Sequence, residues 1–128
     1  MTPEERAGRI DTIIAFDIDG TVDTSGGPIA WADVKATFAS RTDVALGIVS
    51  PSRNRPADET PSFLAGDSGG QDRAENLRMF AATHPGVRMR IYVSDNGDRA
   101  AAVHAGFEYV DAKEFAAGIA AWRPPDVG

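Results

Sequence analysis

Residues 11–22 read Asp-Thr-Ile-Ile-Ala-Phe-Asp-Ile-Asp-Gly-Thr-Val, and this stretch decides the fold. Its first part is a near-continuous apolar run of strand length, which is typical of a central parallel strand covered on both faces. The run ends in two carboxylates, Asp17 and Asp19, and is followed by a glycine that opens a loop. We therefore predict a buried strand over 11–19 whose carboxyl end carries reactive groups.

Predicted strands and helices alternate along the rest of the chain. Apolar runs bounded by turn residues predict strands at 44–49, 88–94 and 107–110, and a weaker strand at 62–65. Start and stop signals predict helices at 29–40, from Asp72 onward, at 97–105 and at 112–122, with loops over 20–28 and most of 50–70. This alternation predicts a three-layer, Rossmann-like α/β fold with a mainly parallel central sheet and helices on both faces.

The size and composition of the chain fit one water-soluble domain. Its 128 residues lie in the usual range for one core, so we expect a single domain over 1–123 and a flexible tail over 124–128. No apolar run approaches a membrane span, and the first residues lack a secretion signal, so we expect a cytoplasmic protein without membrane contact. A net charge of −6 argues against an extended nucleic-acid-binding surface, because such a surface needs many Lys and Arg side chains to neutralise phosphates.

Polar residues follow three of the predicted strands. Asp17 and Asp19 follow the first, Ser50 follows the second, and Asp95 and Asp98 follow the strand at 88–94. In open parallel sheets, ligands bind outside the carboxyl ends of the strands, so we expect these side chains to converge. Converging carboxylates repel each other and need a cation; because the chain has no cysteine, oxygen ligands and Mg²⁺ are favoured over zinc.

A pattern of Asp-x-Asp-Gly-Thr by itself also fits a calcium loop or an acidic turn. An EF-hand loop that started at Asp17 would need glycine at its sixth position and glutamate at its twelfth. Those positions hold Val22 and Pro28. The EF-hand interpretation is therefore excluded.

Taken together, these segments resemble the haloacid dehalogenase-like hydrolases. Asp-Ile-Asp-Gly-Thr-Val at 17–22 is similar to the first signature of that family, and the strand at 44–49 with Ser50 is similar to its second motif. Ile-Tyr-Val-Ser-Asp-Asn-Gly-Asp at 91–98 resembles the acidic fourth motif, and 100–107 resembles the helix and fifth strand that follow it. The resemblance implies the family's Rossmann-like fold.

The resemblance also implies a Mg²⁺-dependent phosphatase that hydrolyses a phosphomonoester through an aspartyl-phosphate. Asp17 would be the nucleophile, and Asp19 would act as general acid and then as general base. Asp17, the backbone carbonyl of Asp19, and Asp95 would hold the metal. Asp98 would either support the metal site or cap the helix that follows it.

The implied phosphate-binding residues are Ser50, Arg73, Thr21 and Gly20, with Thr21 steadying the first loop. The family's third motif is a lysine near the start of the helix before the fourth strand, and this chain has no lysine there. Arg73 is the best positional substitute, because a guanidinium also pairs with phosphate, although with different geometry.

Neither loop where the family inserts a cap domain is long enough to hold one here, so an open site without a cap is expected.

The substrate classes that fit are phosphorylated small molecules and nucleotides, with a nucleic-acid end as a further candidate. Arg53 and Arg55 either meet a second phosphate or a nucleic-acid backbone, or are solvated loop residues. The alternative function is a catalytically impaired module that binds Mg²⁺ or phosphate and acts by binding or regulation. A dehalogenase or phosphomutase is disfavoured by Asp19 and the absent cap. The oligomeric state is left open.

Overall fold

The computed structural model describes residues 10–50, 56, 61–65, 73–95 and 98–119. The strands are β1 (Thr12–Phe16), β2 (Val44–Val49), β3 (Phe63–Ala65), β4 (Met89–Ser94) and β5 (Glu108–Asp111). The helices are α2 (Trp31–Phe38), α3 (Arg73–Ala82), α4 (Arg99–His104) and α5 (Ala112–Gly118), with a short 3-10 helix, η1 (Asp23–Ser25). The predicted cap at Asp72, Arg53 and Arg55, and the tail at 124–128 lie outside the described residues.

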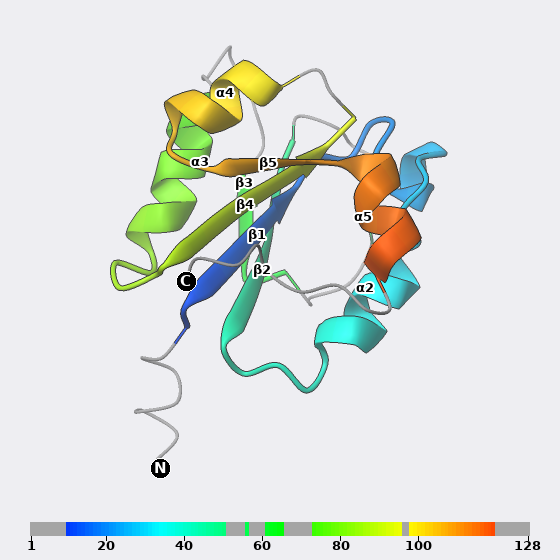
Figure 1. The fold of residues 1–128 in the computed structure, drawn as a ribbon, viewed down its shortest axis with the longest axis horizontal. Helices are drawn as coiled ribbons and strands as arrows, with labels where there is room; N and C mark the ends of the chain where they lie inside the picture. The colour runs from blue at the N-terminus through cyan, green and yellow to red at the C-terminus, as the bar shows by residue number, and fades with distance from the viewer. Residues whose placement is uncertain (1–9, 51–55, 57–60, 66–72, 96–97, 120–128) are drawn as a thin grey trace.

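The strands form one parallel sheet of five in the order β3-β2-β1-β4-β5. β1 lies at its centre and pairs with β2 on one side and β4 on the other. Figure 1 shows α3 and α4 on one face of the sheet and α2 and α5 on the other. The predicted three-layer α/β arrangement with a parallel sheet is confirmed, and its topology is Rossmann-like.

Two apolar clusters fill the space between the sheet and its helices. One lies under α2 and α5, where Phe16 packs edge-on against Trp31 and Phe115 with ring centroids 5.4 Å apart in both pairs. The other lies under α3 and α4 and includes Phe80 and Tyr92. All five residues of β1 are buried, which explains why its sequence is apolar at successive positions instead of alternating.

The observed bounds of β1 and α2 differ from the predicted ones at the ends that adjoin the first loop. β1 ends at Phe16 and not at residue 19, because the Ile18 carbonyl accepts hydrogen bonds from the Thr21 and Val22 amides and turns the chain. α2 begins at Trp31 and not at 29, since Ile29 forms a bridge with Val22.

The other elements lie close to their predicted positions. The predicted weak strand at 62–65 is confirmed as the edge strand β3, and β5 lies one residue later than predicted. α4 covers part of the predicted helix at 97–105, and Gly106 follows it with a φ of 81°, as a helix-terminating glycine does. α5 covers Ala112–Gly118 of the predicted helix at 112–122, and residues 120–122 lie outside the described part of the chain. No helix in the described part of the chain has the length and apolar character needed to span a membrane.

Gly47 of β2 packs directly against the Phe80 ring of α3. A methyl group at this position would lie 2.6 Å from Cε2 and 2.8 Å from Cζ of Phe80, whose ring is fully buried and stacks on Phe63 with centroids 4.8 Å apart. We expect Gly47→Ala to lower the free energy of unfolding by about 1–3 kcal/mol, because overpacking outweighs the better strand propensity of alanine. Denaturant titration followed by circular dichroism measures this change.

Gly86 supplies the matched control. It is exposed in the turn before β4, and a methyl group built there meets no atom within 4 Å. Gly86→Ala is therefore expected to change the free energy of unfolding by less than about 0.5 kcal/mol. Equal losses in the two variants would contradict the close packing of β2 against Phe80.

Candidate active site

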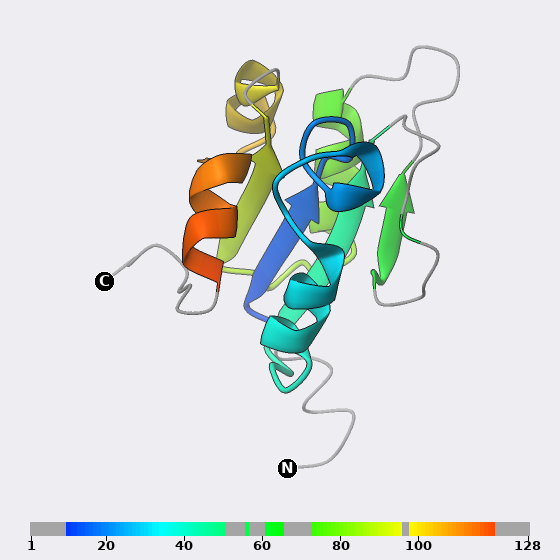
Figure 2. The same ribbon diagram turned by 90° about the vertical axis from the view of Figure 1, so that its right-hand side faces the viewer.

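Asp17 stands at the carboxyl end of the central strand. Its amide donates to the Val93 carbonyl of β4 at 2.9 Å, which continues the ladder one residue beyond β1. Its Oδ1 accepts a hydrogen bond from the Ile18 amide at 2.9 Å, and the residue is only 6% exposed. The carboxylate is therefore fixed by the backbone at the edge where ligands bind in parallel sheets. Figure 2 shows the strands running toward this edge and the loop after β1 lying there.

Side chains from three other elements meet at the Asp17 carboxylate. Arg73 Nη1 lies 3.4 Å from Oδ1, Ser94 Oγ donates to Oδ2 at 3.4 Å, and the Ser50 side chain also hydrogen-bonds to it. Burial raises the pKa of Asp17, and the nearby Asp98 raises it further, whereas Arg73, the Ile18 amide and Ser50 lower it. The structure thus brings Asp17, Ser50 and Arg73 together at this edge.

Arg73 is held mainly through one nitrogen. Its Nη1 donates to Asp98 Oδ2 at 2.7 Å and to the hydroxyl oxygen of Tyr92, in addition to its contact with Asp17. Its Nε is buried and has no hydrogen-bond partner in the described part of the chain. Burial works against the guanidinium charge, but Tyr92, Asp17 and Asp98 outweigh it and raise the pKa of Arg73, so the side chain stays cationic.

Asp98 occupies the residue before α4, but it does not cap that helix. Its side chain makes no hydrogen bond to the first turn. The carboxylate turns instead to Arg73 and lies 3.4 Å from Ser94 Oγ. The helix-cap interpretation is therefore wrong, because a buried cation competes more strongly for the carboxylate than the exposed amides of a short helix.

The two remaining predicted metal ligands lie at the same edge and are exposed. Asp19 follows Asp17 in the first loop, and Asp95 directly follows β4. Gly20 has a φ of 75°, and a methyl group built on it would overlap Oδ2 of Asp95. The Asp95 carboxylate thus approaches the backbone of the first loop, and a glycine is needed there for both the close contact and the positive φ.

The described residues contain no group of three or more His, Asp or Glu side chains close enough together to form a ready-made metal site. Mg²⁺ does not require one, because proteins usually bind it through one or two carboxylates and leave several waters in place. Asp17 and Asp95 with the Asp19 carbonyl match that donor chemistry. These residues fit Mg²⁺ as an oxygen-rich set and offer no nitrogen or sulfur ligand.

Thr21 steadies the first loop through its backbone. Its amide donates to the Ile18 carbonyl and its carbonyl accepts from the Ile29 amide. The side chain is fully buried, and its hydroxyl has no hydrogen-bond partner among the described residues. Ser25, which the sequence analysis did not single out, also braces this loop, because its Oγ contacts the Gly20 amide and the Ile18 carbonyl at 3.2 and 2.5 Å.

Two site residues escaped the sequence analysis. Tyr92 and Ser94 lie on β4, are fully buried and contact Arg73 and Asp17 respectively. The available signal was the pair of hydroxyl-bearing residues that alternate with Ile91 and Val93 in β4 and lead directly to Asp95. Such hydroxyls need buried polar partners, and the nearest candidates are the charged residues at the end of the strand.

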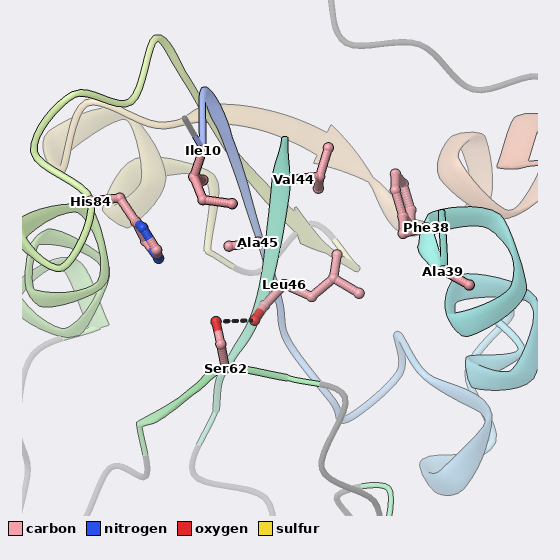
Figure 3. Close-up of a pocket in the computed structure, with 8 residues that line it drawn as sticks. All are labelled: Ile10, Phe38, Ala39, Val44, Ala45, Leu46, Ser62 and His84. Atoms are coloured by element: carbon pink, nitrogen blue, oxygen red, sulfur yellow. Dashed lines mark hydrogen bonds between the residues drawn. The ribbon is translucent and has the colours of Figure 1, made fainter. Parts of the chain in front are cut away.

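A cavity lies at the opposite end of the sheet (Figure 3). Its lining residues come from the amino-terminal half of β2, the end of α2 and the segments before β1, β3 and β4: Ile10, Phe38, Ala39, Val44, Ala45, Leu46, Ser62 and His84. None of the predicted site residues lines it. The carboxylates and the arginine therefore form a separate site at the carboxyl edge.

The chain matches no protein-family model, and it matches none of the curated proteins and none of the solved structures with which it was compared. Its function is therefore inferred from the residues that meet at the carboxyl edge of the sheet, since a fold of this class hosts many activities.

Proposed function

We propose that this protein is a capless, Mg²⁺-dependent phosphatase of the haloacid dehalogenase-like type. It would hydrolyse a phosphomonoester through an aspartyl-phosphate on Asp17. The observation that carries the proposal is the 3.4 Å contact between Arg73 Nη1 and Asp17 Oδ1, at the end of the central strand. It supports a phosphate site because the nucleophile and a permanent cation stand side by side where the transferred group would sit.

The proposed reaction consists of two successive displacements at phosphorus. In the first, a carboxylate oxygen of Asp17 bonds to phosphorus, the bond to the leaving oxygen breaks, and Asp19 gives that oxygen a proton. In the second, Asp19 takes a proton from water, the water oxygen bonds to phosphorus, and the bond to Asp17 breaks. Inorganic phosphate leaves and both aspartates return to their starting states. The exposure of Asp19 suits a group that must meet both the leaving group and water.

Positive charge at the site has two proposed sources. Arg73 would neutralise part of the charge that spreads over the equatorial oxygens during transfer, and Ser50 would donate a hydrogen bond to one of them. Mg²⁺, held by Asp17, the Asp19 carbonyl and Asp95, would polarise the phosphoryl group and screen it from the carboxylates.

The substrate would be a phosphorylated small molecule or a nucleotide. Asp19 and Asp95 are both exposed, and this supports access for a substrate larger than phosphate itself. The ends of nucleic acids are a further class for the same chemistry.

Release of phosphate from p-nitrophenyl phosphate and from a panel of nucleotides and sugar phosphates tests the proposal. We expect turnover with Mg²⁺, loss of turnover with excess EDTA, and recovery when Mg²⁺ is added back. Circular dichroism of the EDTA-treated protein controls for unfolding. A folded protein that binds Mg²⁺ but releases no phosphate from any compound would contradict the proposal and favour the binding or regulatory module.

A further inference from the structure

Tyr92 carries a buried hydroxyl group that has no role in the proposed reaction. It lies on β4 and is fully buried, in register with Ala15 of the central strand. Its hydroxyl accepts a hydrogen bond from Arg73 Nη1 and donates one to the Val49 carbonyl at 3.3 Å. Val49 directly precedes Ser50. The phenol therefore joins the Arg73 side chain to the backbone that directly precedes Ser50, and both residues are proposed to bind the phosphoryl group.

We propose that Tyr92 is the positioning residue of the phosphate site, an inference that rests on the proposed function. Its hydroxyl holds the Arg73 guanidinium against the end of β2, so that Arg73 and Ser50 are aligned before a phosphorylated substrate arrives. Asp98 Oδ2 accepts a hydrogen bond from the same nitrogen at 2.7 Å and also holds the guanidinium in place.

The physical reason is the flexibility of arginine. A free arginine side chain explores many rotamers, and ordering it at each turnover costs conformational entropy. Tyr92 comes from an inner strand of the sheet and has few rotamers of its own, so it provides a rigid acceptor. A charged donor that neighbouring residues already hold in place stabilises the charge of the transition state without having to reorganise.

The contacts also divide the guanidinium into two sides. The contacts of Arg73 with Tyr92, Asp98 and Asp17 all use Nη1. Nε remains without a partner in the described part of the chain. The supporting residues thus hold the planar group on one side, and its rigid plane fixes the direction in which its other nitrogens point, which a point charge such as lysine cannot do.

Tyr92→Phe removes the hydroxyl and keeps the ring in the core. We expect kcat/KM for phosphomonoesters to fall about 10- to 100-fold, as expected when one hydrogen bond to a charged group is lost. Thr83→Val is the control. It also removes a hydroxyl that donates to a backbone carbonyl, that of Phe80 at 2.6 Å, but Thr83 follows the carboxyl end of α3, whereas Arg73 begins that helix. Its kcat/KM is expected to stay within about twofold of wild type.

A double-mutant cycle separates positioning from a loss of general stability. If Tyr92 acts through Arg73, Tyr92→Phe in an Arg73→Met background changes kcat/KM by less than about twofold. A purely structural role would lower activity equally in both backgrounds. An unchanged Tyr92→Phe single variant, or additive effects in the cycle, would overturn the proposal while leaving the phosphatase proposal intact.

Calorimetric binding of inorganic phosphate in the presence of Mg²⁺ gives a second readout that does not need turnover. Tyr92→Phe is expected to weaken this binding in the wild-type background and to leave it unchanged in the Arg73→Met background. Coupling in phosphate binding without turnover would keep the positioning role and overturn the phosphatase. Neither turnover nor phosphate binding in the wild type would overturn both.

Discussion

Asp17→Asn is expected to lower phosphatase turnover by at least about 10³-fold with the fold intact, because an amide cannot form the aspartyl-phosphate. The variant keeps the size of the side chain and the acceptor for the Ile18 amide, which is a hydrogen bond of 2.9 Å in the parent. It removes one carboxylate from the proposed Mg²⁺ site and the partner of Arg73 at 3.4 Å. Phosphate release and thermal unfolding, measured on the same preparation, separate the two effects.

The pKa of Asp17 predicts the sign of the stability change. Burial is the largest influence and raises the pKa of the folded state above the ordinary value for aspartate. A carboxyl group with a raised folded pKa contributes stability below the unfolded pKa and loses that contribution as the pH rises through the folded pKa. Above the folded pKa, the buried charge costs stability. The side chain of the Asp17→Asn variant is neutral at every pH, so we expect the variant to unfold there at the same temperature as the parent or at a higher one.

Asp33→Asn is the matched control for this experiment. Asp33 is exposed in the first turn of α2, and the same chemical change there should leave turnover within about twofold. Turnover that survives in Asp17→Asn at more than about a tenth of the parent rate would contradict Asp17 as the nucleophile. Loss of turnover in both variants would point to a change outside the proposed chemistry.

Arg73→Met is expected to lower turnover by about 10²–10³-fold, the usual result of removing one preorganised donor that stabilises transition-state charge. Methionine fills similar apolar volume but leaves Asp17 and Asp98 without the cation that lies between them. Arg73→Lys keeps a positive charge at this position. We expect it to recover part of the activity, since an ammonium cannot reproduce the geometry of the guanidinium.

Arg78→Met on the same helix controls for the loss of a positive charge on α3. Arg78 is exposed, and we expect its variant to keep full activity. Steady-state kinetics and melting temperatures for the three arginine variants distinguish a catalytic defect from a folding defect. Full activity in Arg73→Met would contradict the phosphate role of Arg73 and leave Mg²⁺ as the source of positive charge.

Local sequence patterns were sufficient to predict the architecture. The apolar run that became β1 is buried at every position, and α2, which lies within the helix predicted at 29–40, buries Trp31, Val34 and Phe38. These features depend on residue type and spacing within one element, and the crossover rule then restricts how such elements can be joined. The bounds of the elements shifted because loop hydrogen bonds, such as those of the Ile18 carbonyl, take residues away from helices and strands.

The site was predictable only in part, and the division has a physical basis. The sequence by itself determined that Asp17, Ser50 and Asp95 follow parallel strands, so topology alone brings them to one edge of the sheet. Only the tertiary structure decided that Asp98 binds Arg73 instead of capping α4, and that Tyr92 supports the same guanidinium. These partners are 25 and 19 residues from Arg73 along the chain, and whether they meet depends on how α3 packs against β4, which no local pattern encodes.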